Sequence, residues 1–158
     1  MSELNKIALK IVSSGKGILA ADESTATMTK RLESVKVKSN EENRLKFRST
    51  LFSSSSMKEC IGGVILYDET IKQKYKDQSI SELISESGTI TGIKVDTGAK
   101  QLAKSENEKI TEGLDGLRDR LKEYYQLGAR FTKWRAVYII SESQPTKLAI
   151  NTNAHALA

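Results

Sequence analysis

Charged residues lie in segments that otherwise have the composition of buried strands, and five of them are candidates for chemistry. Lys94 and Asp96 share a face of one segment, because side chains two residues apart point the same way on a strand. Lys133 and Arg135 share a face of a second segment, and Asp22 ends a third. Taking an isolated ion out of water costs several kcal/mol, so such residues are seldom buried without a partner or a task. Three basic residues against two acids suit an anionic substrate, and an amine beside a carboxylate suits proton transfer near a hydroxyl or carbonyl.

The same charges also have a purely structural interpretation. Lys94 with Asp96, or Lys133 with Asp22, could be ion pairs whose members satisfy one another. A ligand-binding site is favoured over structural ion pairs, because three strands would place charged side chains at the same end of the sheet. Ligands bind at the carboxyl ends of parallel strands. The chain has no GxGxxG or GxxxxGK[ST] nucleotide motif, and Ser24 has no nearby histidine for a triad. Ser24 is better placed to cap the helix that follows it.

Four short apolar runs predict the strands that must position these charges. The runs are nearly continuous rather than alternating, which is typical of strands buried on both faces. They cover residues 17–22, 61–70, 89–98 and 129–140.

Apolar residues at helical spacing predict helices between the strands. Ser39 and Glu42 form a capping-box pattern at the start of one of them. The helices are expected over 3–13, after Ser24, over 41–52, near 80–86, over 114–127 and beyond Pro145.

Strands that alternate with helices, without a hairpin signal between neighbouring strands, predict a parallel sheet with crossover helices. Two architectures remain open, an open doubly wound sheet and a (βα)n barrel, because periodicity does not separate them. No repeat, linker or shift in composition predicts a second domain, so residues 1–158 are expected to form part of one domain.

Composition excludes several classes of protein. The chain has 158 residues, 38% of them apolar and 28% charged, which predicts a globular domain with a core. No run approaches the roughly 18 apolar residues of a membrane span, and the first residues lack a signal peptide's apolar core, so a cytosolic protein is expected. Single Cys60 and His155 residues exclude an internal disulfide and a multi-histidine metal site within these residues. The net charge of +5 is compatible with nucleic acid, an anionic metabolite or solvated lysines.

Six sequence motifs are more specific than composition. They are GKGILAADEST at 15–25, EENR at 41–44, CIGGVILYDET at 60–70, GIKVD at 92–96, EGLDGL at 112–117 and KWRAV at 133–137. Their order and spacing resemble those of class I, Schiff-base-forming fructose-bisphosphate aldolases over nearly the whole chain. The resemblance implies a (βα)8 TIM barrel, of which residues 1–158 would be the N-terminal half, about the first four βα units. It also implies reversible cleavage of fructose 1,6-bisphosphate into dihydroxyacetone phosphate and glyceraldehyde 3-phosphate in glycolysis, with no metal or other cofactor.

The resemblance assigns two catalytic residues. Asp22 resembles the aspartate that contacts the C4 hydroxyl of the substrate and helps position proton transfer. Lys133 matches the lysine beside the Schiff base, whose ammonium group stabilises the developing anion.

Five further residues resemble substrate-binding positions of the family. Lys94 and Arg135 match basic residues that engage the substrate, chiefly a phosphate end. Ser24, Thr27 and Arg31 correspond to positions after the first strand that contact phosphate. Thr27 stands where the family pattern has serine, and a hydroxyl is retained.

The chain also departs from the family pattern. Asp68 stands where many relatives have histidine, and Thr97 where many have lysine. A (βα)8 barrel needs about 250 residues. The strand-five glutamates, the strand-six imine lysine and the later serine and arginine are not among residues 1–158. We therefore expect a fragment that is inactive alone. Its sheet would have unpaired edge strands, which should make the fragment prone to aggregation and only marginally stable.

Two hypotheses on function stay open at this point. The first is the enzyme, with a sugar phosphate as substrate and, as the resemblance implies, a homotetrameric full-length protein. The second is a non-catalytic phosphate-binding half-barrel or assembly module that pairs with another chain. Nucleic-acid binding is not supported, because the aromatic residues lie at predicted core positions, and a membrane association is not expected.

Overall fold

The computed structural model describes the backbone of residues 1–158 and every side chain except that of Ser14. Contacts divide the chain into two compact units. The first unit comprises Met1–Lys94 and Lys122–Thr132, and the second comprises Val95–Leu121 and Lys133–Ala158. The expectation of a single domain stays a prediction.

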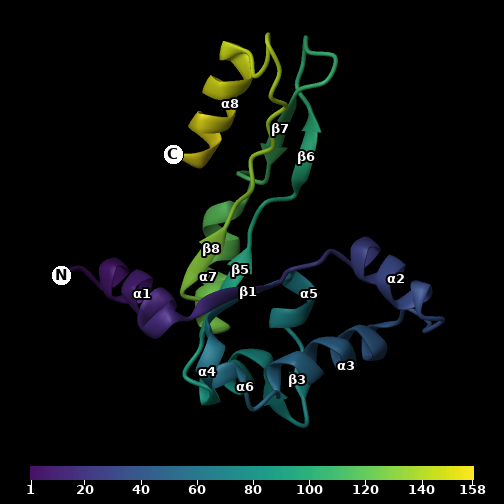
Figure 1. The fold of residues 1–158 in the computed structure, drawn as a ribbon, viewed down its shortest axis with the longest axis vertical. Helices are drawn as coiled ribbons and strands as arrows, with labels where there is room; N and C mark the ends of the chain where they lie inside the picture. Colours follow the sequence, from purple (N-terminus) through teal and green to yellow (C-terminus); the bar gives the residue numbers. More distant parts are fainter. The chain divides into compact units, whose positions relative to one another are not determined.

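A four-stranded parallel sheet in the order β1-β2-β5-β8 confirms the predicted strands (Figure 1). Leu66 at the end of β2 lies opposite Ala21 of β1 on one side and Ile93 of β5 on the other. Val64, Leu66 and Ile93 are fully buried, as the continuous apolar runs predict. Each strand is shorter than expected, and the fourth ends at Lys133 instead of continuing to residue 140. The strands are β1 Gly17–Ala21, β2 Ile61–Leu66, β5 Ile90–Lys94 and β8 Phe131–Lys133.

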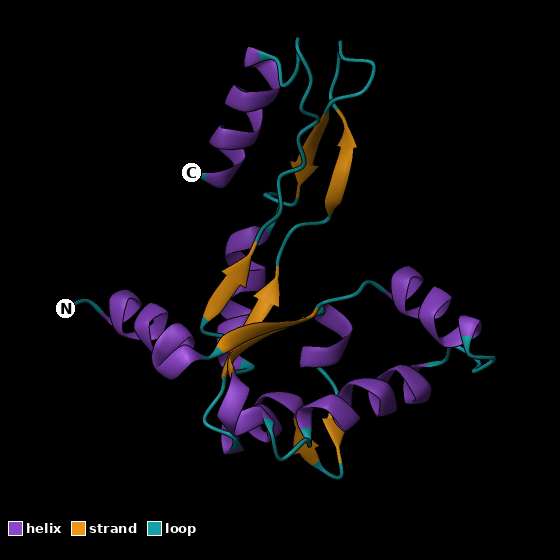
Figure 2. Cartoon of the chain, viewed as in Figure 1, coloured by secondary structure: helices purple, strands orange, loops and turns teal.

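Helices connect these strands where helical spacing predicts them (Figure 2). The structure adds a short 3-10 turn, η1, and two short helices, α4 and α5, at either end of β2. The helical segments are α1 Glu3–Val12, η1 Ser13–Gly15, α2 Thr25–Ser34, α3 Glu41–Phe52, α4 Met57–Cys60, α5 Asp68–Ile71, α6 Ile80–Glu86, α7 Leu117–Gln126 and α8 Lys147–Leu157.

Side-chain caps fix where several helices begin. Ser24 caps α2 as predicted, because its hydroxyl accepts the backbone N–H of Thr27. The expected capping box at Ser39 is wrong by one residue: the side chain of Asn40 caps α3 and accepts the N–H of Asn43 at 2.8 Å. Asparagine is as good an N-cap as serine, so the pattern alone did not decide between neighbours.

Glycines let the first unit pack closely around its sheet. A Cβ on Gly92 would lie 2.4 Å from the Phe131 ring, and one on Gly63 would lie 3.1 Å from the same ring. A Cβ on Gly62 would meet the carbonyl oxygen of Ile11 at 1.8 Å. The GG of β2 and the glycine of GIKVD are therefore needed for close packing of Phe131 and α1.

A polar cluster joins α5 to α7 within the first unit. The carboxylate of Asp68 accepts hydrogen bonds from the Tyr124 hydroxyl at 2.8 Å and from the Lys72 ammonium at 2.9 Å. Lys72 also pairs with Glu123 at 3.2 Å. The pKa of Lys72 is raised, first by its hydrogen bond to Asp68. Asp68, which departs from the family pattern, thus has a structural role here.

Two antiparallel hairpins are present that the sequence did not predict. β3 Lys74–Tyr75 pairs with β4 Gln78–Ser79 in the first unit. β6 Gly98–Gln101 pairs with β7 Lys109–Glu112 in the second unit.

Helix α8 is attached to the second hairpin by a buried amide. The Nδ2 group of Asn153 donates to the carbonyl of Lys109 at 2.9 Å, and its Oδ1 accepts the N–H of Thr111 at 3.2 Å. Asn153 is fully buried. Its side chain therefore satisfies the backbone of β7 as a further strand would.

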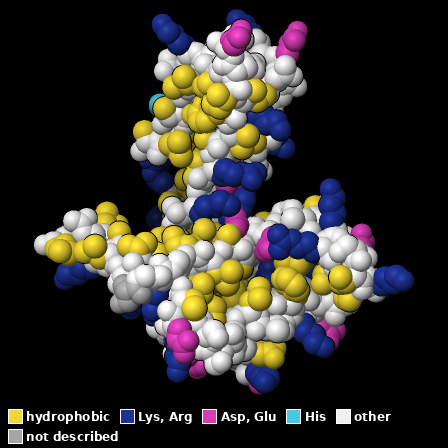
Figure 3. All heavy atoms as spheres, viewed as in Figure 1, with side chains coloured by type: hydrophobic (Ala, Val, Ile, Leu, Met, Phe, Trp, Pro, Cys, Tyr) yellow, Lys and Arg dark blue, Asp and Glu magenta, His cyan; other side chains and the backbone are white. Residues whose placement is uncertain are grey.

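Apolar side chains also remain on the surface of the first unit. Leu4, Leu9 and Val12 of α1 are exposed, and Figure 3 shows apolar side chains gathered over this helix. Ile18 of β1 is exposed as well.

Candidate active site

Candidate catalytic and binding residues stand at the carboxyl ends of strands. Asp22 directly follows β1, Lys94 is the last residue of β5, and Lys133 is the last residue of β8. In barrels of parallel strands this is the end at which ligands bind and catalysis takes place.

The environments of these residues differ. Within the first unit Asp22 is buried, with 9% of its surface exposed, and Lys94 is half-buried. Within the second unit Lys133 is half-buried, and its carbonyl accepts the N–H of Val95 at 3.1 Å. The placement of Lys133 and Arg135 against Asp22 and Lys94 stays a prediction.

Arg135 does not lie in a strand, contrary to expectation. β8 ends two residues earlier, and Arg135 is exposed. Its backbone carbonyl accepts the hydroxyl of Thr111 at 2.6 Å, which ties it to β7. The burial argument that singled out Arg135 was therefore wrong, because it rested on a strand that continued past Lys133.

The segment after β1 brings three predicted phosphate-binding residues onto one helix, with Ser24 as its N-cap, Thr27 in its first turn and Arg31 in its last turn. The hydroxyls of Ser24 and Thr27 lie 3.2 Å apart at the start of α2, and Arg31 follows one turn later. The Arg31 guanidinium forms an ion pair with the carboxylate of Glu23. A helix N-terminus with two hydroxyls and a nearby cation is an arrangement that can hold an anion.

A network of two arginines lies directly behind this segment, and sequence reasoning missed it. Arg44 and Arg48 of α3 both pair with Glu69 of α5. Arg44 does so with both carboxylate oxygens, Nε to Oε1 at 3.0 Å and Nη2 to Oε2 at 2.7 Å. Arg48 reaches further and donates from Nη2 to the backbone carbonyl of Glu23 at 2.5 Å. The EENR motif supplies Arg44 and the YDET motif supplies Glu69. The presence of both motifs in the sequence was the available signal for this ion pair.

The two arginines have opposite pKa shifts. The hydrogen bond to Glu69 raises the pKa of Arg44. Burial lowers the pKa of Arg48, although the charge of Glu69 acts in the other direction. Arg48 has no exposed surface. Guanidinium groups stay charged in proteins, so a buried cation is held beside the candidate site.

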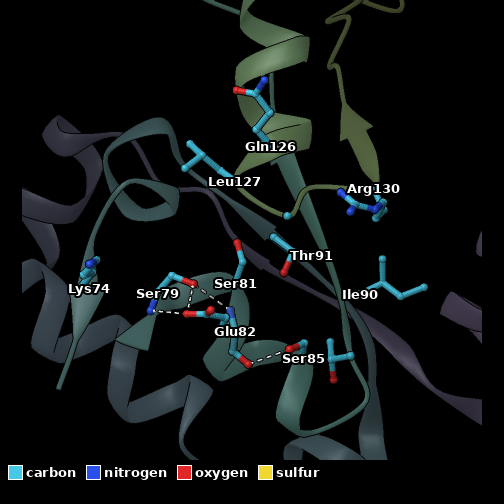
Figure 4. Close-up of a pocket in the computed structure, with 12 residues that line it drawn as sticks. Lys74, Ser79, Ser81, Glu82, Ser85, Ile90, Thr91, Gln126, Leu127 and Arg130 are labelled. Carbon is cyan, nitrogen blue, oxygen red and sulfur yellow. Dashed lines mark hydrogen bonds between the residues drawn. The ribbon is translucent and has the colours of Figure 1, made fainter. Parts of the chain in front are cut away.

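A concavity of the first unit lies near the amino ends of the strands, opposite the candidate residues. It has a volume of about 590 Å³ and includes Ile90, the first residue of β5, and Arg130, which precedes β8 (Figure 4). Figure 4 shows Ser81 of α6 projecting into the same space as Thr91. The candidate residues at the carboxyl ends of the strands do not line it. Its lining comprises Lys74, Ser79, Ser81, Glu82, Ser85, Thr89, Ile90, Thr91, Gln126, Leu127, Gly128 and Arg130.

The described residues contain neither a cluster of metal ligands nor a membrane-spanning helix. Among the described residues, no three His, Cys, Asp or Glu side chains gather closely enough to hold a metal ion. In the same part of the chain no helix is long and apolar enough to cross a membrane.

Comparison with known proteins identifies the family. The chain has the architecture of a partial (βα)8 barrel, and it superimposes on a ternary co-crystal structure of fructose-bisphosphate aldolase from Plasmodium falciparum with a TM-score of 0.94. The two sequences are 44% identical, over 98% of this chain and 46% of that one. The family model of class I fructose-bisphosphate aldolase matches residues 3–158, so the chain belongs to this family.

Two similar proteins from other organisms are also fructose-bisphosphate aldolases. A fructose-bisphosphate aldolase of non-muscle type from Lethenteron camtschaticum is 52% identical over 99% of this chain and 43% of its own length. A cytosolic fructose-bisphosphate aldolase 6 from Arabidopsis thaliana is 48% identical over 99% of this chain and 44% of its own. The chain therefore spans less than half the length of these relatives.

Proposed function

We propose that the chain supplies the first half of the barrel of a fructose-bisphosphate aldolase that acts in glycolysis. The reaction is the reversible cleavage of fructose 1,6-bisphosphate to dihydroxyacetone phosphate and glyceraldehyde 3-phosphate, through a lysine Schiff base and without a metal. The observation that supports this most directly is that Lys94 and Lys133 end strands of one sheet, and Asp22 directly follows another of its strands, in a chain of this family.

In this proposal two residues take part in the chemistry. Cleavage breaks the C3–C4 bond, and its electron pair moves into the protonated imine while the C4 hydroxyl loses a proton. Asp22 contacts that hydroxyl and positions the proton transfer. The Lys133 ammonium stabilises negative charge that develops beside the imine.

The remaining candidate residues bind the phosphate groups in this proposal. Lys94 and Arg135 engage the substrate by charge, chiefly at a phosphate end. Ser24, Thr27 and Arg31 form the second group, and α2 with its N-cap carries all three. For Arg31 to reach a phosphate, the anion must compete with the carboxylate of Glu23.

The imine-forming lysine of this proposal is outside residues 1–158, so the isolated chain does not cleave the substrate. The test is a fusion of residues 1–158 to the complementary half of the Lethenteron aldolase. Cleavage of fructose 1,6-bisphosphate is measured by a coupled NADH assay. We expect the fusion to be active, and the same fusion with Asp22→Asn to lose most of its turnover.

Two outcomes would count against the proposal. A folded fusion without activity would favour the phosphate-binding module instead, provided that it still binds inorganic phosphate. Full activity of the Asp22→Asn fusion would remove Asp22 from the reaction. We further propose that the complete protein is a cytosolic homotetramer, which sedimentation of the fusion tests.

A further inference from the structure

Glu23 lies between the candidate catalytic Asp22 and the helix-capping Ser24, and two arginines hold it. The Nη2 group of Arg48 donates to the backbone carbonyl of Glu23 at 2.5 Å. The guanidinium of Arg31 pairs with the Glu23 carboxylate, which is itself only 14% exposed. One residue of the segment after β1 is thus fixed at both its backbone and its side chain.

Arg48 contacts the segments that follow both β1 and β2. Besides the Glu23 carbonyl, it donates from Nη1 to Glu69 Oε1 at 3.4 Å, and its guanidinium carbon lies 5.9 Å from the centre of the Tyr67 ring. The side chain is fully buried, and among the described residues its Nε has no hydrogen-bond partner. Burying a charge so incompletely paired is costly, and apolar side chains often replace buried ion pairs without loss of stability. Packing alone therefore does not explain a charged side chain at this position.

Arg44 provides an internal comparison. It lies one turn before Arg48 on α3 and pairs with the same carboxylate of Glu69, in better geometry. Its side chain is partly exposed, and its described hydrogen bonds go to Glu69 and Ser39. Arg44 therefore shares the ion-pair network with Arg48 but not the contact to Glu23.

We propose that Arg48 is a positioning residue for the active site, which rests on the proposed aldolase function. The peptide group is planar, so fixing the carbonyl oxygen of Glu23 also fixes the plane that carries the N–H of Ser24. This peptide group follows Asp22 in the chain and leads into Ser24, the N-cap of α2. Fixing it therefore fixes the position of Asp22 relative to the start of α2. Arg48 touches no reacting atom in this proposal; it acts through Glu23 on both proton transfer and phosphate binding.

Kinetic measurements on the fusion test this role. Arg48→Met removes the charge and the donor, whereas Arg48→Lys keeps the charge and loses the planar fork. Misplacement of a catalytic group by about 1 Å costs on the order of a hundredfold in rate, so we expect a kcat loss approaching that size for Arg48→Met. KM for fructose 1,6-bisphosphate should rise, and Arg48→Lys should recover only part of the loss. The matched control, Arg44→Met, removes the other arginine that pairs with Glu69 and should lower the melting temperature with kcat near the parent value.

A measurement that needs no activity separates this inference from the aldolase proposal. Hydrogen–deuterium exchange of the 158-residue chain reports on residues 22–28, which include the N–H of Met28 that donates to the Ser24 carbonyl at 2.9 Å. Arg48→Met should accelerate exchange there more than Arg44→Met does at equal global stability. An inactive parent fusion with this selective exchange would reject the aldolase function and keep the positioning role. Equal effects of the two substitutions on exchange, or on kcat in an active fusion, would overturn it.

Discussion

In the proposed function Lys133 acts through its charge and not through packing. It is half-buried at the end of β8, where proposed catalysis moves negative charge. Replacing it with methionine, of similar length, in the active fusion removes one preorganised electrostatic contact. We expect kcat to fall on the order of a hundredfold, as losses of such contacts do.

Stability of the Lys133→Met fusion should change much less than turnover. Lys133 is partly exposed, so water screens the charges left behind, and the several kcal/mol of a dry broken pair is an upper limit. Steady-state kinetics and thermal melts of the same variant decide between the two roles. Turnover within about threefold of the parent, with a sharp fall in melting temperature, would make Lys133 a structural ion-pair partner and not a catalytic group.

Gly92 tests the packing that holds β5 against β8. An added Cβ would lie 2.4–2.6 Å from three atoms of the Phe131 ring, so the ring or the backbone must move. Such overpacking costs about 1–3 kcal/mol, and urea unfolding of Gly92→Ala should show a loss of this size.

Gly17 of β1 is the matched control for that substitution. A Cβ added at Gly17 would have no neighbouring atom within 4 Å, so Gly17→Ala should leave stability unchanged or slightly raised. A second variant, Gly92→Ala with Phe131→Leu, should recover part of the loss. If Gly17→Ala and Gly92→Ala are equally stable, the contact with Phe131 does not limit residue 92.

At the scale of elements, one carboxylate holds the start of α8, where Thr146 is the N-cap. Glu108 accepts the backbone N–H of Thr146 at 2.7 Å, the Thr146 hydroxyl at 2.7 Å and the Ser105 hydroxyl at 3.2 Å. These hydrogen bonds, that of the Thr146 backbone first, lower the pKa of Glu108 below its usual 4.5. Because the folded pKa is depressed, this stabilisation is complete above the unfolded value and is lost as the pH falls through the folded one.

Glu108→Gln makes that pH dependence testable. The amide cannot ionise, so the variant should be less stable than the parent near neutral pH, and the difference should shrink as the pH falls below 4.5. Thermal melts recorded from neutral pH to about pH 3 provide the comparison, because other carboxylates titrate alike in both proteins. A stability difference that is constant over this range would show that ionised Glu108 does not hold the start of α8.

Prediction from sequence succeeded where an element buries a continuous apolar run. The strands with Val64, Leu66 and Ile93 were found for this reason, and Ser24 was correctly expected to cap α2. The β6–β7 hairpin was missed because residues 98–112 are largely polar and show no alternation. Arg48 was missed because a charge on a helix usually faces water, and its partners lie 21 and 25 residues away.

For the molecule as a whole, the central expectation is that residues 1–158 hold only part of the chemistry. In the proposal Lys94 and Lys133 act as ammonium ions, and the imine forms on a lysine outside these residues. Incubating the 158-residue chain with dihydroxyacetone phosphate and sodium borohydride should therefore leave both lysines unmodified. The fusion, treated in the same way, should gain one reduced adduct in the half contributed by the Lethenteron protein. Mass spectrometry locates the adduct in each case. A stoichiometric adduct on Lys94 or Lys133 of the chain alone would contradict the assignment of these residues as ammonium groups. It would show that they can form the imine themselves.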